Sequence, residues 1–172
     1  MKILVLSDSH SALSFMYRCV QTIKPDAIIH LGDYFDDGQA LHEAFPEIPC
    51  YQVSGNCDRY RCPPGQPEIL VEQIGGVTLY LTHGHLHRVK SGTGGLLASA
   101  RESGAAAVLY GHTHQADCRQ EPDGLWVLNP GSCGGYGGSA GVLELDGGSV
   151  VTCRILQAAD LLLEASAKES RP

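Results

Sequence analysis

Short apolar runs alternate with helix-like segments over the first third of the chain. The apolar runs are bounded by turn residues, which is typical of buried strands. The first helix-like segment carries apolar residues at helical spacing and closes before Pro25, and the second stops at Pro46. We predict strands at residues 2–7, 27–31 and 50–53, and helices at residues 11–23 and 38–45. This β-α-β-α-β order favours a parallel sheet with helices on its faces.

Hairpin signals dominate the rest of the chain. Two alternating or apolar segments flank Gly75-Gly76, which predicts a hairpin. The expected strands are residues 68–74, 77–82, 105–110, 117–120, 125–128, 140–145 and 150–156, with a helix at residues 94–103. Two mixed sheets packed face to face with helices outside would form a four-layer α/β/β/α sandwich. We expect one domain over residues 1–157 and a tail, residues 158–172, that could end in a helix.

Composition narrows the classes of partner. The 172 residues are 43% hydrophobic and 18% charged, which is ordinary for a globular domain. The formal net charge of −7 offers no broad basic surface for nucleic acid or for an anionic membrane. An acidic protein can still bind phosphate if metal ions supply the local positive charge. We therefore expect a small-molecule substrate, with no dedicated nucleic-acid surface and no membrane contact.

Targeting signals and cysteine usage indicate a cytoplasmic protein. The N-terminal apolar run is too short for a signal peptide, and no apolar stretch approaches the roughly 18 residues of a membrane span. Seven cysteines are scattered without a CxxC pair, which argues against a disulfide scaffold. Cys57 and Cys62 lie near enough in the sequence to suggest a redox pair, but we expect plain thiols there.

Five short polar segments each follow a predicted strand. Carboxyl ends of strands are where open α/β sheets bind ligands, and they aim side chains from a rigid base. The segments are Asp8-Ser9-His10, Gly32-Asp33, Gly55-Asn56, His83-Gly84-His85 and Gly111-His112-Thr113-His114. Singly, the Asp and Asn residues could be helix caps or turn residues. Paired histidines at two strand exits are harder to explain structurally, so a functional cluster is favoured.

The chemistry of these segments points to metal ions. Aspartate, asparagine and histidine form a mixed oxygen and nitrogen donor set that suits Mn, Fe, Co, Ni or Zn. Seven candidates are too many for one ion and suit two sites that share a carboxylate. Two neighbouring ions can clamp a phosphate and activate a water molecule. Thr113, between two candidates, could position them through its hydroxyl group.

On these motifs, the chain resembles the calcineurin-like metallophosphoesterase superfamily, and within it the small phosphodiesterases of the YfcE type. The motifs DxH, GD, GN, HGH and GHTH occur in the family's order, and the segment 128–132 (LNPGS) also matches. The resemblance implies that Asp8, His10 and His114 hold one ion. It also implies that Asn56, His83 and His112 hold the second, with Asp33 bridging both. Mn²⁺ is the expected metal, with Fe, Ni, Co or Zn as alternatives.

One position departs from the wider superfamily. Many members have histidine where this chain has Cys57, and that histidine is the one usually assigned to protonate the leaving oxygen. We expect His85 to take the catalytic role, although packing beside His83 explains it equally well. No residue is expected to bind an organic cofactor.

The implied activity is hydrolysis of phosphate esters, most of all diesters, by attack of a hydroxide that bridges the ions. The alternatives are a phosphomonoesterase or nuclease with the same metals, and a non-catalytic protein-interaction scaffold like Vps29. The scaffold has an impaired metal site, whereas every expected ligand is present here. Homo-oligomerisation is open.

Overall fold

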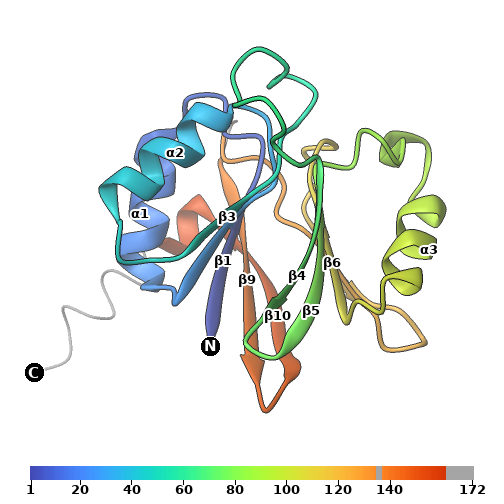
Figure 1. Cartoon of the computed structure of the whole chain (residues 1–172). Coiled ribbons are helices and arrows are strands. Elements are labelled where there is room, and N and C mark those ends of the chain that lie inside the picture. The colour runs from blue at the N-terminus through green and yellow to red at the C-terminus, as the bar shows by residue number, and fades with distance from the viewer. Residues whose placement is uncertain (135–136, 162–172) are drawn as a thin grey trace, which may run out of the picture.

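Two mixed sheets of five strands pack face to face between helices, which confirms the predicted four-layer fold (Figure 1). The computed structural model describes residues 1–134 and 137–161. The first sheet has the order β10-β9-β1-β2-β3 and the second has the order β4-β5-β6-β8-β7. The first contains β1 (Lys2–Leu6), β2 (Ala27–His30), β3 (Cys50–Gln52), β9 (Ser139–Asp146) and β10 (Ser149–Gln157). The second contains β4 (Ile69–Ile74), β5 (Val77–Thr82), β6 (Ala107–Tyr110), β7 (Asp117–Gln120) and β8 (Trp126–Asn129).

Side chains alternate between layers along the buried strands. In β1, Ile3 and Val5 enter the core between the two sheets, whereas Leu4 and Leu6 face the helical layer. That layer contains α1 (Leu13–Ile23) and α2 (Phe35–Ala44), and α3 (Gly94–Glu102) covers the second sheet (Figure 1). A short 3-10 helix, η1 (Val89–Ser91), precedes α3. A strand such as β1, which lies between two layers, is apolar on both faces because both faces are buried.

Parallel pairing sets the position of the polar segments. β1, β2 and β3 run parallel in the first sheet, and β5, β6 and β8 run parallel in the second. The carboxyl ends of parallel neighbours meet at one edge of their sheet. The motifs after β1, β2 and β3 therefore meet at one edge, and those after β5 and β6 meet at another.

The start of α2 differs from the prediction. The helix begins at Phe35 and not at residue 38, because the carboxylate of Asp58 accepts a hydrogen bond from the Phe35 N–H at 2.9 Å. This donor would otherwise be one of the unpaired N–H groups of a helix start. Its partner lies 23 residues away, beyond the reach of a local sequence pattern.

One disulfide bond was not predicted from the sequence. Cys118 of β7 and Cys153 of β10 form a disulfide, with Cα atoms 6.4 Å apart. The two strands belong to opposite sheets, and both cysteines pack against the core between them. A spacing of 35 residues without a motif gives no sign of this pairing. The other five cysteines are free thiols.

The predicted tail is only partly described. Residues 158–161 are helical, and residues 162–172 lie outside the described residues, so the boundary at 157 stays a prediction. Within residues 1–134 and 137–161, no helix combines the length and apolar character needed to cross a bilayer.

Candidate metal centre

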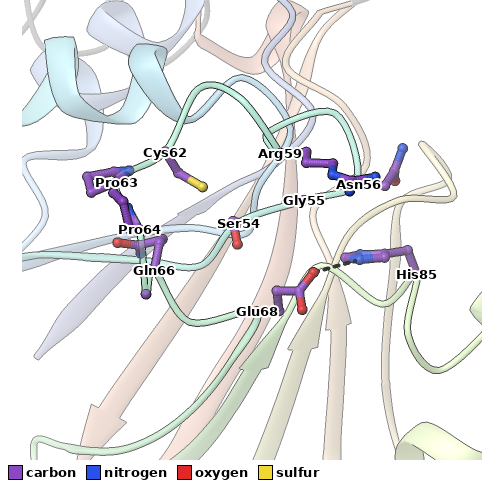
Figure 2. Close-up of a pocket in the computed structure, with 11 residues that line it drawn as sticks. Ser54, Gly55, Asn56, Arg59, Cys62, Pro63, Pro64, Gln66, Glu68 and His85 are labelled. Atoms are coloured by element: carbon purple, nitrogen blue, oxygen red, sulfur yellow. Dashed lines mark hydrogen bonds and ion pairs between the residues drawn. The ribbon is translucent and has the colours of Figure 1, made fainter.

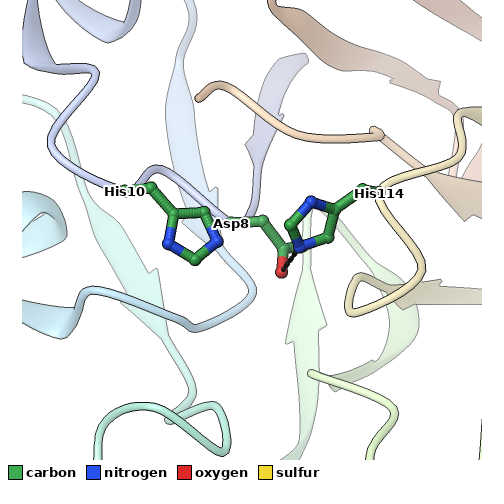
Figure 3. Close-up of side chains that lie close together, drawn as sticks. All are labelled: Asp8, His10 and His114. Atoms are coloured by element: carbon green, nitrogen blue, oxygen red, sulfur yellow. Dashed lines mark ion pairs between the residues drawn. The ribbon is translucent and has the colours of Figure 1, made fainter. Parts of the chain in front are cut away.

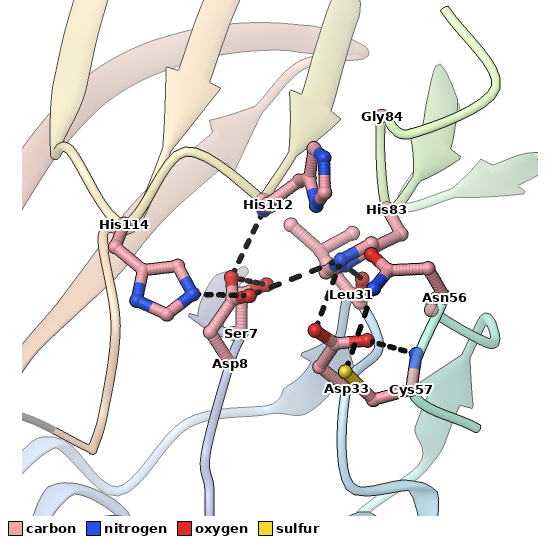
Figure 4. Close-up of polar contacts among 12 residues, drawn as sticks. Ser7, Asp8, Leu31, Asp33, Asn56, Cys57, His83, Gly84, His112 and His114 are labelled. Carbon is pink, nitrogen blue, oxygen red and sulfur yellow. Dashed lines mark hydrogen bonds and ion pairs between the residues drawn. The ribbon is translucent and has the colours of Figure 1, made fainter. Parts of the chain in front are cut away.

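The predicted metal ligands of both sheets meet in one place (Figure 4). Asp8 follows β1, Asp33 follows β2, His83 follows β5, and His112 and His114 follow β6. Two groups of side chains present ligand atoms that all lie within 4.8 Å of one another. The groups are Asp8 with His10 and His114, and Asp8 with Asp33 and His83. The first is the trio that the family resemblance implies for one ion.

Hydrogen bonds to one oxygen orient the Asp8 carboxylate, and its other oxygen accepts none. Its Oδ2 accepts hydrogen bonds from the Ser7 hydroxyl at 2.6 Å and from the His112 N–H at 3.0 Å. Its Oδ1 is buried and has no hydrogen-bond partner. That atom lies 3.1 Å from His114 Nε2 and 3.8 Å from His83 Nε2 (Figures 3 and 4). Asp8 thus presents one oxygen to a cluster of imidazole nitrogens.

His83 is held in the orientation expected of a metal ligand. Its Nδ1 lies 2.8 Å from the Leu31 carbonyl oxygen, which requires an N–H at that nitrogen. Nε2 then faces the centre, 3.4 Å from Asp33 Oδ2, while Asp33 Oδ1 accepts the N–H of Cys57 at 2.9 Å. Ligating histidines are commonly fixed by such a bond from the other nitrogen.

Charge around His83 and Asp33 is strongly coupled. Burial alone would lower the pKa of His83, but the carboxylates of Asp33 and Asp8 raise it overall. Burial alone would raise the pKa of Asp33, but His83 and the Cys57 N–H lower it overall. The pKa of His112 is lowered by burial and by neighbouring His83, which favours the neutral form of its imidazole. A neutral imidazole and ionised carboxylates are the forms that bind metals.

Unpartnered buried atoms show that the centre fits cations. His10 Nε2 and His83 Nε2 lack hydrogen-bond partners, as does Asp8 Oδ1. The His10 ring packs against Tyr34 at 4.8 Å and lies 5.3 Å from the His114 ring. Buried polar atoms are rarely left without a partner, and these belong to residue types that bind divalent ions. The chemistry of the donor set and its missing partners agree.

Asn56 lies at the same centre but is more exposed. Figure 4 draws its amide alongside His83 and Asp33. Its Nδ2 is 3.4 Å from the Cys57 sulfur, the only hydrogen bond of this side chain given by the described residues. All seven predicted ligands are therefore placed around one region, and their division between two ions stays a prediction. Asp8 belongs to both groups above, whereas the resemblance makes Asp33 the bridge.

Backbone strain is concentrated at the centre. Among the described residues, nine that are not glycine have positive φ, and five of these are predicted ligands. The five are Asp8, His10, Asp33, His112 and His114. Such conformations are unfavourable for side chains with a Cβ and are typical of functional sites.

Sequence reasoning assigned no role to Asp58. Its buried carboxylate accepts backbone N–H groups from Asp33 at 2.9 Å, Phe35 at 2.9 Å and Gly55 at 2.7 Å. It therefore fixes the loops that carry Asp33 and Asn56. Its position directly after the Gly55-Asn56 motif was the available signal.

Asn129 was also missed, although it lies in the matched LNPGS segment. Its Nδ2 lies 3.1 Å from the Gly111 carbonyl oxygen and 2.9 Å from the Thr113 hydroxyl, and its Oδ1 accepts the Gly131 N–H at 2.9 Å. Asn129 thus ties the loop that carries His112 and His114 to the end of β8. The Thr113 hydroxyl contacts this asparagine, which supports its predicted positioning role.

His85 lies beside the ligand cluster, with its ring 6.1 Å from that of His112, and lines a neighbouring cavity (Figure 2). Its Nε2 lies 3.2 Å from Glu68 Oε1, and its ring is 5.5 Å from that of His83. The cavity has a volume of about 630 Å³ and is also lined by Asn56. A second cavity, of about 320 Å³, is lined by His114 and Ser132. Cavities therefore adjoin the centre beside Asn56 and beside His114.

Comparison with known proteins gives a consistent result. The calcineurin-like phosphoesterase superfamily domain matches residues 1–148. A probable metallophosphoesterase of Bacillus subtilis, YsnB, is 33% identical over 139 residues. The match covers 77% of this chain and 75% of YsnB. Phosphodiesterase MJ0936 of Methanocaldococcus jannaschii is 28% identical over 153 residues, and the match covers 79% of this chain and 86% of MJ0936.

Solved structures share the fold. A predicted phosphoesterase from Streptococcus pneumoniae has a TM-score of 0.68 at 27% identity. The match covers 91% of this chain and 97% of the other. Vps29 of Chaetomium thermophilum has a TM-score of 0.74 at 20% identity, and the match covers 91% of this chain and 87% of Vps29. The latter likeness concerns the fold alone.

Proposed function

Because the chain belongs to the calcineurin-like phosphoesterase superfamily, we propose that it hydrolyses small phosphate esters with two divalent ions and prefers diesters. The observation that carries the proposal is the convergence of buried donor atoms without partners, Asp8 Oδ1, His10 Nε2 and His83 Nε2. Leaving such atoms unpaired is unfavourable, and a cation compensates for it.

Seven side chains would hold the ions. Asp8, His10 and His114 form one set, Asn56, His83 and His112 the other, and Asp33 is shared. When bound, such ions neutralise charge on a phosphate and lower the pKa of a water molecule. Mn²⁺ is our first choice, although this donor set accepts Fe, Co, Ni and Zn.

His85 is our choice for the residue that protonates the leaving oxygen. It lines the larger cavity beside the predicted ligand Asn56, and Glu68 holds its ring in place. Cys57, in contrast, is not among the described residues that line this cavity.

Two observations support a preference for diesters, namely the cavities beside the centre and a related protein that is named a phosphodiesterase. A diester carries an organic group on each side of its phosphate. Cavities adjoin the centre at both Asn56 and His114, with volumes of about 630 and 320 Å³. MJ0936, a relative at 28% identity, is named a phosphodiesterase.

Substitution of the shared carboxylate tests this function. Asp33→Asn removes a negative charge from the centre, so we expect weaker metal binding and a loss of turnover. Loss of groups that merely orient a metal ligand costs up to about a hundredfold, so loss of the shared ligand should cost more than about a hundredfold. The measurement is kcat/KM for bis(4-nitrophenyl) phosphate and 4-nitrophenyl phosphate, with metal content determined on the same samples.

Asp146→Asn is the matched control. It makes the same change of charge at a residue that is exposed at the end of β9. It should retain activity and metal content. Near-normal turnover by a fully metallated Asp33→Asn protein would contradict the proposal. Wild-type protein that hydrolyses neither ester with any of the metals would favour the scaffold alternative.

A further inference from the structure

The larger cavity is lined by the loop at residues 54–66, by Glu68 just before β4 and by His85 just after β5. Figure 2 shows Cys62, Pro63 and Gln66 on one side and Asn56 and His85 on the other. Its volume of about 630 Å³ falls within the range of sites for small organic ligands, about 300–1,000 Å³. Since Asn56 also belongs to the metal centre, a phosphate bound there would have one of its organic groups beside this cavity.

Arg59 supplies the uncompensated charge of the cavity. It is the only lysine or arginine among the described residues that line it. Its guanidinium lies 5.6 Å from the centre of the Tyr60 ring and forms no ion pair with a carboxylate of the described residues. Arg61, two positions later, is paired with Asp36 at 3.2 Å. Arg59 is therefore free to bind an anion.

The other polar groups of the wall already have partners. Glu68 lies 3.2 Å from His85, and Gln66 donates to the Gln52 carbonyl oxygen at 2.7 Å. Glu68 thus leaves the positive charge of Arg59 available. A guanidinium offers paired N–H groups that match a carboxylate or a phosphate.

Phenylalanine, tyrosine and tryptophan are absent from the described lining residues. Tyr60 is 91% exposed and does not line the cavity. The wall therefore lacks the large aromatic platforms on which proteins that bind single-stranded nucleic acid stack successive bases. The wall suits a small, charged group better than a base.

We infer that this cavity binds one organic group of the substrate and that Arg59 selects esters in which that group carries a second anion. The anion is a carboxylate or a phosphate, which the guanidinium binds through the same geometry. This assignment rests on the proposed phosphoesterase function. It names Arg59 as a determinant of specificity, separate from the metal ligands and from His85.

Two diesters that both release coloured nitrophenolates test the inference. Bis(4-nitrophenyl) phosphate has neutral organic groups, and bis(3-carboxy-4-nitrophenyl) phosphate has anionic ones. The readout is the ratio of kcat/KM for the anionic diester to that for the neutral one, because intrinsic reactivity cancels when variants are compared. Arg59→Gln should lower this ratio about tenfold, as expected for loss of a charge-assisted hydrogen bond. Arg59→Lys should restore part of it, because it keeps the charge without the paired donors.

Calorimetry gives a second readout that does not depend on turnover. The metal-loaded protein should bind 3-carboxyphenylphosphonate more tightly than phenylphosphonate, and Arg59→Gln should remove about tenfold of that difference. The control is Arg18→Gln, which makes the same change of charge at an exposed position of α1 away from the cavity lining. Arg18→Gln should leave both the activity and the ratio unchanged.

The outcomes separate the two proposals. If wild-type protein hydrolyses both diesters and Arg59→Gln leaves the ratio unchanged, the role of Arg59 is overturned and the phosphoesterase function stands. If wild-type protein hydrolyses neither diester with any of the metals, the proposed function fails and the substrate assignment fails with it.

Discussion

Groups outside the predicted ligand set fix the geometry of this centre. Ser7 fixes one oxygen of Asp8, the Leu31 carbonyl fixes His83, and Asp58 fixes the loops around Asp33. Such supporting contacts orient ligands before an ion arrives, which reduces the cost of binding it.

His30 makes the stability of the protein depend on pH. It is fully buried in β2, with Nε2 3.2 Å from the Ser9 hydroxyl. Burial lowers its pKa from 6.5 to about 4. The unfolded chain therefore takes up a proton at a higher pH than the native protein does. The resulting stability is fully present above pH 6.5 and is lost as the pH falls toward 4, by up to about 3 kcal/mol.

Urea unfolding between pH 7 and pH 4 measures this effect. His30→Gln keeps a polar group near Ser9 but does not titrate, so its free energy of unfolding should fall less steeply than that of the wild type. Equal slopes in both proteins, or an NMR titration that places the His30 pKa near 6.5, would contradict the prediction.

At the scale of elements, the centre depends on close contact between the loops that follow β2 and β3. A Cβ atom on Gly55 would lie 2.2 Å from Asp33 Oδ1 and 2.5 Å from the Asp33 nitrogen. Only glycine fits such an approach. The glycine of the Gly55-Asn56 motif is therefore needed for the position of Asp33.

Paired glycine substitutions test this contact. Gly55→Ala should destabilise the protein by about 1–3 kcal/mol and weaken metal binding, because Asp33 must move. Gly95→Ala, in the first turn of α3, meets no atom within 4 Å and should stabilise the helix by about 0.5 kcal/mol. Urea unfolding and metal titration check both variants. A Gly55→Ala protein with unchanged stability and metal affinity would show that the loops have more room than described.

The sequence predicts elements well where local patterns decide them. All ten strands and the three α-helices of residues 1–134 and 137–161 were expected near their observed positions, because buried strands leave continuous apolar runs and half-buried strands such as β4 leave alternating patterns. The start of α2 could not be predicted, since its cap comes from Asp58. The same holds for the disulfide between Cys118 and Cys153, which only the stacking of the two sheets brings together.

At the scale of the whole molecule, the centre forms because the loops that follow strands of both sheets meet in one place. Asp8 and Asp33 come from the first sheet, and His83, His112 and His114 come from the second. The predicted ligands could be proposed from sequence because each lies within a few residues of the end of its strand. Their supports were missed, because Asp58 and Asn129 form hydrogen bonds with loops 25 and 18 residues away in the chain.

Crystals grown with Mn²⁺ and measured at wavelengths on both sides of the manganese edge test the central claim most directly. We predict two anomalous peaks about 3.5–4 Å apart. Asp8, His10 and His114 should surround one peak, Asn56, His83 and His112 the other, and Asp33 should contact both. A single peak, or no peak among these side chains under saturating Mn²⁺, would contradict the account.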